Sequence, residues 1–438
     1  MSIAQIDQPA PQKPLRLWPG VVIVVLQWLG RFVVPIVVPE AYPFGAIGGL
    51  VGGLAVVVWW AFFSRAPRTE RWGAVVLMIV AMVATRPITH VSIQNGMMGM
   101  MFVMYAIPVL RLAFVAWAVA SRRLSAVPRR VAMLAAILLG CGVWTLVRTN
   151  GVNGGGSDLA WRWTKTAEER LLAQPGDEPT ALPPAPAAAA PAVDKPAALP
   201  SAPAAAATAH AAVKPATLPP VSVAPETGAD WPGFRGPDRD DIIPGVRIET
   251  DWSKSPPVEL WRRPIGPGWS SFAVRRGLLY TQEQRGDDEL VACYNMTTGK
   301  PVWRHSDATR FWESNGGAGP RATPTLSDGR VYTFGATGIL NALDARNGAV
   351  VWSRNVASDT GAKIPGWGFA SSPLVVGDVV IVHAGALVAY DRATGDRRWF
   401  GPARGAGYSS PHLVTIDGIT QVLQMSGVGA TRDRKSVV

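Results

Sequence analysis

Cysteine is nearly absent from this chain of 438 residues, which contains 2 cysteines and 5 histidines. Cys141 lies in a long apolar run and Cys293 in a short strand-like segment, so we expect no disulfide between them. The sequence has no CxxCH motif, no CxxC motif, no adjacent cysteines and no paired His–Cys spacing. These absences exclude covalently attached c-type haem and give no indication of a metal site.

Charged residues are also few, at 17% of the chain, and they are unevenly placed. The formal net charge is +11, but residues 230–438 contain 24 Lys or Arg against 21 Asp or Glu, a balance of +3. The remaining +8 lies in residues 1–229, mostly between apolar runs. This distribution is typical of membrane topology, so we predict no nucleic-acid partner.

Long apolar runs do occur, and they predict an α-helical membrane domain in residues 1–150, because a spanning helix needs about 20 apolar residues. The five predicted spans are residues 17–38, 43–63, 72–90, 97–120 and 131–147. The first run is too long for a cleaved signal peptide and is expected to be a retained anchor.

Arginine residues decide the predicted orientation of these spans. They gather in the second and fourth connecting loops, as Arg65, Arg68, Arg71, Arg122, Arg123, Arg129 and Arg130. Cationic loops stay in the cytoplasm, so the N-terminus is predicted to be cytoplasmic and the region after the fifth span periplasmic. The predicted location is the bacterial inner membrane.

Two connecting segments follow the apolar runs. Residues 151–173 include Trp161 and Trp163 and predict an interfacial aromatic patch leading into a short helix. Residues 174–229 are dominated by Ala and Pro. Such a composition cannot bury a core and predicts a disordered linker.

One short phrase recurs three times in the last third of the chain. An Asn or Asp is followed four residues later by Gly and four residues after that by Trp. The three copies are Asn295, Gly299 and Trp303, then Asp344, Gly348 and Trp352, then Asp391, Gly395 and Trp399. The tryptophans are 49 and 47 residues apart, a period typical of propeller blades.

Each residue type of the phrase has a structural reason. Asn or Asp bonds the backbone of a turn, and Gly takes the positive φ that closes it. The Trp is then expected on the outer strand of a four-stranded blade, packed against the neighbouring blade. Gly-rich segments lead to a Ser or Thr before each blade, which suits inner strands crowded around a channel.

The blade count predicts an incomplete propeller in residues 230–438. Three full blades are present, with one strand before them at Trp261 and the opening of another blade in residues 410–430. A propeller needs at least four blades, and an open arc leaves bare strand edges. We therefore expect a truncated product of a longer gene.

The repeats resemble the pyrroloquinoline quinone (PQQ) repeat, found in quinoprotein dehydrogenases and in propellers that bind no quinone, such as BamB-type assembly lipoproteins. The segment Asp230–Pro237, DWPGFRGP, also resembles the start of bacterial PQQ-like propeller proteins. Five helices followed by a propeller is similar to the layout of membrane-bound quinoprotein glucose dehydrogenases. The resemblance covers about residues 230–430 and implies the fold more specifically than the chemistry.

In that family the quinone lies in the channel between aromatic faces, with Ca²⁺ held by carboxylate and amide oxygens and an Asp as base. No family catalytic residue can be carried over to this chain. The candidate cofactor-binding residues are Trp269, Trp312, Glu313, Asn315, Arg321, Trp367 and Tyr408. Packing is the alternative role for the aromatic members. The acidic run at residues 287–289 is expected to be a solvated loop.

Within the predicted spans, Arg31 and Arg111 stand out because charge is costly in a bilayer and often functional. These two arginines are expected either to contact a quinone or a lipid, or to extend their charged ends toward the lipid headgroups.

We expect a membrane-anchored periplasmic propeller that acts as a binding or scaffold module, with the lipid bilayer and envelope proteins as partners. The alternative is a PQQ- and Ca²⁺-dependent dehydrogenase that oxidises a sugar or alcohol and reduces membrane quinone. A membrane sensor that signals through the helices is a third class, favoured by topology alone.

Overall fold

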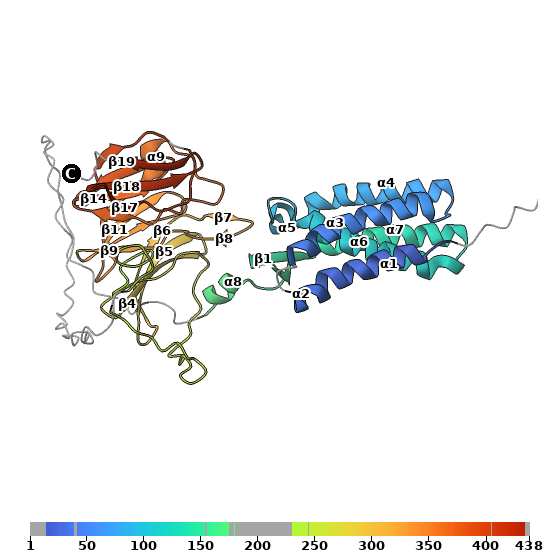
Figure 1. Cartoon of the computed structure of the whole chain (residues 1–438), viewed down its shortest axis with the longest axis horizontal. Coiled ribbons are helices and arrows are strands. Elements are labelled where there is room, and N and C mark those ends of the chain that lie inside the picture. The colour runs from blue at the N-terminus through green and yellow to red at the C-terminus, as the bar shows by residue number, and fades with distance from the viewer. Residues whose placement is uncertain are drawn as a thin grey trace, which may run out of the picture. The chain divides into compact units, whose positions relative to one another are not determined.

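The computed structural model describes residues 15–38, 42–153, 156–174, 179, 230–243, 245–403 and 405–433 (Figure 1). They form two compact units, one from residues up to Leu172 together with Trp312–Ala318, the other from the remaining residues. Most of the predicted linker, residues 174–229, lies outside the described residues.

The first unit is a bundle of apolar helices. Its elements are α1 (Trp18–Trp28), η1 (Leu29–Val33), α2 (Val34–Val37), α3 (Tyr42–Val58), η3 (Trp59–Phe63), α4 (Arg68–Thr85), η4 (Arg86–Ile88), α5 (Val91–Asn95), α6 (Met101–Ala120), η5 (Ser121–Arg123), α7 (Ala126–Gly142) and η6 (Val143–Thr145). A hairpin of β1 (Val147–Asn153) and β2 (Gly156–Trp161) and the short helix α8 (Ala167–Leu172) follow.

Three of these helical stretches are long and apolar enough to cross a membrane: residues 68–88, 101–123 and 126–145. Local backbone signals set their bounds. Pro67 has an extended ψ of 144° and precedes α4. Met97 and Met98 take positive φ, so α6 begins at Met101 and not at the predicted Met97. A total of five spans stays a prediction.

Aromatic side chains hold the middle of the bundle together. The Trp60 ring meets Phe114 edge-on at a centroid distance of 4.8 Å and Trp117 at 5.7 Å. At one end, Glu70 at the start of α4 lies 3.6 Å from Arg129 and 3.5 Å from Arg130 at the start of α7. The two connections that carry the arginine clusters therefore adjoin each other.

The second unit is built from antiparallel sheets of four strands, as predicted for propeller blades. The first sheet has β3 (Ala273–Arg275), β4 (Leu278–Arg285), β5 (Asp288–Asn295) and β6 (Pro301–Asp307). The second has β9 (Thr325–Ser327), β10 (Arg330–Phe334), β11 (Ile339–Asp344) and β12 (Val350–Asn355). The third has β13 (Leu374–Val376), β14 (Val379–His383), β15 (Leu387–Asp391) and β16 (Arg397–Phe400).

A further sheet of three strands follows, with β17 (His412–Ile416), β18 (Ile419–Ser426) and β19 (Gly429–Asp433). We call the four sheets blades 1 to 4 in chain order. The first strands of blades 1, 2 and 3 adjoin, with β9 between β3 and β13. In the sequence between β6 and β9, the chain also forms a two-stranded hairpin of β7 (Trp312–Glu313) and β8 (Gly317–Ala318). The short helix α9 (Val356–Thr360) follows β12. Incompleteness of the propeller stays a prediction.

The repeated phrase forms the turn between the third and fourth strands of each blade. The Asp391 carboxylate accepts the N–H groups of Ala393 and Thr394 at 2.8 and 2.9 Å, and Gly395 closes the turn with a φ of 77°. Asn295 acts in the same way in blade 1. The predicted turn chemistry is confirmed.

Two of the three phrase tryptophans, Trp303 and Trp352, pack on the turn glycine of the next blade. Trp303 lies against Gly348, and Trp352 lies against Gly395, where an added Cβ atom would be 2.7 Å from the ring. The indole N–H of Trp352 donates to the backbone oxygen of Arg392 at 3.0 Å. Trp261, which precedes blade 1, makes the same kind of contact with Gly299. The predicted packing against the neighbouring blade is confirmed for Trp303 and Trp352.

Apolar side chains fill the space between neighbouring blades. Tyr332, Phe334 and Leu340 of blade 2 and Val380 and Tyr390 of blade 3 are fully buried in one cluster. Burial of these faces stabilises each sheet only when its neighbour is present.

We expect Gly348→Ala to lower the unfolding free energy by about 2–4 kcal/mol, because the new methyl group would clash with Trp303 and would sit at a φ of 72°. Thermal unfolding of the full chain in detergent measures the change. Gly329→Ala is the matched control, since Gly329 has a φ of 74° and open space around it. Equal losses in the two variants would contradict the Trp–Gly contact.

Candidate functional site

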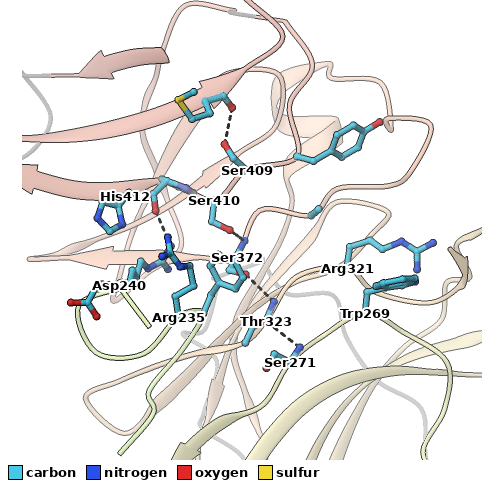
Figure 2. A pocket seen from close by; sticks show the side chains of 16 residues that line it. Arg235, Asp240, Trp269, Ser271, Arg321, Thr323, Ser372, Ser409, Ser410 and His412 are labelled. Atoms are coloured by element: carbon cyan, nitrogen blue, oxygen red, sulfur yellow. Dashed lines mark hydrogen bonds between the residues drawn. The ribbon is translucent and has the colours of Figure 1, made fainter. Parts of the chain in front are cut away.

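A cavity of about 660 Å³ lies where the four blades begin (Figure 2). Its walls combine aromatic, cationic and hydroxyl side chains with one carboxylate. The lining residues are Phe234, Arg235, Arg239, Asp240, Trp269, Ser271, Arg321, Thr323, Ala370, Ser372, Tyr408, Ser409, Ser410, Pro411, His412 and Met425. All of them belong to the second unit.

A ladder of hydroxyl groups runs along this wall from blade to blade. The N–H of Ser271 donates to Thr323 Oγ1 at 3.2 Å, that of Thr323 to Ser372 Oγ at 2.9 Å, and that of Ser372 to Ser410 Oγ at 2.9 Å (Figure 2). Each hydroxyl accepts one bond through its oxygen and keeps its proton as a donor. The sequence predicted small residues at these positions for steric reasons. The structure shows that the hydroxyl groups of Thr323, Ser372 and Ser410 also accept backbone hydrogen bonds from the neighbouring blade.

The segment 230–243 contacts the first strands of blades 1 and 2 and the residues just before the first strands of blades 3 and 4. Trp231 exchanges backbone bonds with Val274 in blade 1, and Pro232 accepts the N–H of Leu326 in blade 2 at 2.7 Å. Arg239 donates to the backbone oxygens of Pro373 and, at 2.8 Å, Pro411, next to blades 3 and 4. This strap forms one side of the cavity.

The charges around the cavity are mainly positive. Arg239 is 8% exposed, and burial lowers the pKa of its guanidinium to about 10, so it stays charged at neutral pH. Arg235 pairs with Asp241 at 2.7 Å, and the Arg321 guanidinium lies over the Phe311 ring at 5.2 Å. Asp240 is the one acidic side chain among the lining residues.

The structure brings together four of the seven candidate residues from the sequence. Trp269, Arg321 and Tyr408 line the cavity. The Trp367 ring packs on Tyr408 at 5.1 Å, and its backbone oxygen accepts a bond from Arg321 Nε at 3.2 Å. Trp367 therefore supports the wall, which fits the alternative of packing.

The other three candidates lie in the β7–β8 hairpin. Glu313 accepts the N–H groups of Asn315 and Gly316, so its carboxylate closes the hairpin turn. Asn315 Oδ1 accepts the N–H of Met97 at 2.8 Å within the first unit. Trp312, Glu313 and Asn315 are absent from the residues that line the cavity.

Several carboxylates of the second unit bond to other side chains of that unit. Glu283 accepts the Tyr294 hydroxyl at 2.7 Å and Arg285 Nε at 3.2 Å. Asp359 accepts the Tyr390 hydroxyl at 3.0 Å. Glu289 was expected in a solvated loop, but it lies on β5 and is 3% exposed, because β5 faces the neighbouring blade.

Sequence reasoning did not identify Phe234, Arg235, Arg239, Ser409 or His412 as cavity residues. The segment DWPGFRGP carried a family signal, but nothing in it indicated that Arg239 would be buried. Contacts with Pro373 and Pro411 join positions more than 130 residues apart. No local pattern reports such a contact.

Antiparallel four-stranded sheets joined by Trp–Gly contacts, with a cavity at their inner strands, are the features of propeller-like blades. Residues 256–427 match the family described as outer membrane protein assembly factor BamB, whose members carry PQQ repeats. The match covers less than half of the chain, and over these residues the chain is similar to that PQQ-like repeat family.

Similar proteins include the outer membrane protein assembly factor BamB of Yersinia pestis, 26% identical over 173 residues, which are 36% of this chain and 40% of the relative. Tetrathionate hydrolase of Acidithiobacillus ferrooxidans is 32% identical over 174 residues, 35% of this chain and 33% of the relative. The quinohemoprotein alcohol dehydrogenase structure from Comamonas testosteroni has 18% identity and a TM-score of 0.32, over 45% of this chain and 35% of that one. The chain thus spans less than half the length of these relatives.

The family resemblance raises the question of PQQ with Ca²⁺. Ca²⁺ takes six to eight oxygen ligands. The cavity offers Asp240, whose Oδ1 already accepts the N–H of Ile242 at 2.9 Å. In the part of the chain that the structure describes, no three His, Cys, Asp or Glu side chains gather to hold a metal ion. The described residues therefore do not fit a Ca²⁺ site.

We expect Ser372→Ala to lower the unfolding free energy by about 1–3 kcal/mol, because it leaves the buried N–H of Thr323 without an acceptor. Ser372→Thr keeps the hydroxyl and should restore most of the loss. Ser271→Ala is the control, since Ser271 contributes its N–H to the ladder. Unfolding in urea measures all three, and a Ser271→Ala loss as large as that of Ser372→Ala would contradict the ladder.

The raised pKa of Glu289 predicts that the unfolding free energy of the protein depends on pH. Burial raises the pKa of Glu289 to about 7 from 4.5, and the nearby Asp307 carboxylate adds to this, while the Ala336 N–H and Arg321 act against it. The folded protein binds the proton more tightly than the unfolded chain, so this stability is complete below pH 4.5 and is lost as the pH rises to 7.

Relative to Glu289→Gln, the wild type should lose on the order of 3 kcal/mol of unfolding free energy across that interval. Unfolding in urea between pH 4 and pH 8 measures this difference. Glu259→Gln serves as the control because Glu259 is an exposed partner of Arg262. A difference between wild type and Glu289→Gln that does not change with pH would refute the assignment.

Proposed function

We propose that this chain is a membrane-anchored propeller of the bacterial envelope that acts as a binding or scaffold module. Its N-terminus is cytoplasmic, five helices cross the inner membrane, and the propeller lies in the periplasm. Residues 151–173 rest at the membrane interface, and residues 174–229 tether the propeller. The cavity at the blade openings binds an acidic segment of another envelope protein.

The observation that carries the proposal is the composition of the cavity wall. Arg235 and Arg321 and the hydroxyls of Thr323, Ser372 and Ser410 are donors, and Asp240 is the one carboxylate of the lining. A wall with this excess of donors suits an acceptor-rich, negatively charged partner. The exposed Trp269 and half-exposed Tyr408 add flat apolar surface of the kind enriched at interfaces.

The arginine pattern supports the proposed orientation. Glu70 forms ion pairs with Arg129 and Arg130, so the starts of α4 and α7 lie at the same end of the bundle. Arg65, Arg68 and Arg71 belong to the chain that enters α4, and Arg122 and Arg123 to the chain that enters α7. One end of the bundle therefore carries both cationic loops, as expected of a cytoplasmic end.

Aromatic side chains support the interfacial position of residues 151–173. The rings of Trp161 and Trp163 stack at 5.2 Å with an angle of 7° between their planes. Both are exposed, and tryptophan is enriched at the headgroup level of membranes.

A photo-crosslinking experiment tests the binding proposal. A photoreactive amino acid at position 408, in the full chain expressed in bacteria, should crosslink a defined envelope protein. The same amino acid at position 350, which is exposed on the outer strand β12, is the matched control. The crosslink should weaken about tenfold or more with Arg321→Gln, since a charge-assisted bond is lost. Equal crosslinking from positions 408 and 350 would refute a role for the cavity.

Calorimetry with PQQ separates this function from the dehydrogenase. The purified full chain is titrated with PQQ, with and without Ca²⁺, and tested for dye-linked oxidation of glucose and ethanol. We expect neither stoichiometric binding nor activity, because the cavity lacks the acidic residues that hold Ca²⁺. Stoichiometric, Ca²⁺-dependent binding would replace the scaffold proposal with the enzyme.

A further inference from the structure

Arg111 is a buried charge near the middle of helix α6. Its side chain is 3% exposed. Nε donates to the backbone oxygen of Ile107, one turn earlier, at 3.2 Å. Both terminal nitrogens, Nη1 and Nη2, are buried and have no hydrogen-bond partner in the described part of the chain. The part of the guanidinium best suited to bind an anion is therefore unused.

Gln27 of α1 shares this position. It is 9% exposed, and both its amide nitrogen and its amide oxygen lack a partner among the described residues. The two side chains meet over Gly52 of α3, where an added Cβ atom would clash with Arg111 Nη1 and lie 3.4 Å from Gln27 Cγ. The missing side chain at residue 52 thus makes room for a polar cluster built from three helices.

The described helices offer Arg111 no counter-charge. Glu70 is the single acidic residue in the described segments 15–38 and 42–145, and it forms ion pairs with Arg129 and Arg130. An uncompensated charge among apolar helices is strongly unfavourable, and such residues commonly face a ligand or a partner charge. The compensating group must come from outside these segments.

We propose that Arg111, Gln27 and Gly52 form a binding site for a carboxylate carried by a lipophilic molecule. The proposal rests on the membrane placement proposed above. Nη1 and Nη2 provide four N–H donors in a planar fork that matches the two oxygens of a carboxylate. The Gln27 amide adds two donors and one acceptor. A ketone or quinone carbonyl would use fewer donors and would leave the positive charge uncompensated.

Dodecanoate is the test ligand, with dodecanol as its uncharged match, added to the full chain in dodecyl maltoside. Dodecanoate should raise the midpoint of thermal unfolding in a saturable manner, and dodecanol should not. Arg111→Gln should weaken the apparent affinity for dodecanoate about tenfold or more, because the bidentate pair is lost. Arg122→Gln removes an exposed arginine next to the same helix and should leave the affinity unchanged.

Two further measurements keep the test decisive. Without ligand, Arg111→Met should unfold at a higher temperature than the wild type, because it removes an uncompensated buried charge. If Arg111 variants fail to fold, Gln27→Leu keeps the charge, removes the amide and should still weaken binding.

Equal responses to dodecanoate and dodecanol, or unchanged affinity in Arg111→Gln, would overturn the site. Saturable stabilisation by a decyl-benzoquinone and not by dodecanoate would overturn the carboxylate class. Cysteine-accessibility mapping of the connecting loops, done on the same preparations, reports the membrane topology separately. If the ligand test fails and the mapped topology agrees with the proposed one, the carboxylate site is refuted and the proposed function is not affected.

Discussion

The contact between a tryptophan and a turn glycine is the interaction on which the propeller unit depends. Each ring occupies the space of the side chain that the next blade lacks, and its N–H bonds a carbonyl of the same turn. A single four-stranded sheet would leave its apolar faces in water, so the blades are stable only against one another. The hydroxyl ladder links the inner ends of the blades as the tryptophans link the outer ends.

These two lines of contact position the cavity and shape its chemistry. The strap of residues 230–243 bonds the first strands of successive blades, so a wall made from four sheets keeps a defined form. Most carboxylates of the blades are engaged in turns or in bonds to Tyr and Arg side chains, which leaves hydroxyls, guanidinium groups and aromatic rings at the wall. This set of groups supports the proposed recognition of an anionic partner.

The buried arginines of the two units differ in how many hydrogen-bond acceptors they reach. In the propeller, the buried guanidinium of Arg239 reaches two backbone carbonyls and joins two blades. In the helical bundle, the intrahelical bonds already occupy most backbone carbonyls, and Arg111 reaches one of them through Nε. A helix satisfies most of its own backbone carbonyls and leaves few acceptors for a guanidinium buried near its middle, which is why a ligand is proposed for Arg111.

The blades, their turns, the tryptophan contacts and the apolar helices could be predicted from the sequence, because each depends on residues close in the chain or repeated at a fixed period. The sequence also singled out Trp269, Arg321 and Tyr408, which lie at blade openings and line the cavity. It placed Trp312, Glu313 and Asn315 with them, although these form a separate hairpin. The path of the strap along the blades, the burial of Arg239 and the meeting of Arg111 with Gln27 over a glycine become visible only in three dimensions. Such contacts join distant segments through packing, and packing leaves no local pattern in the order of residues.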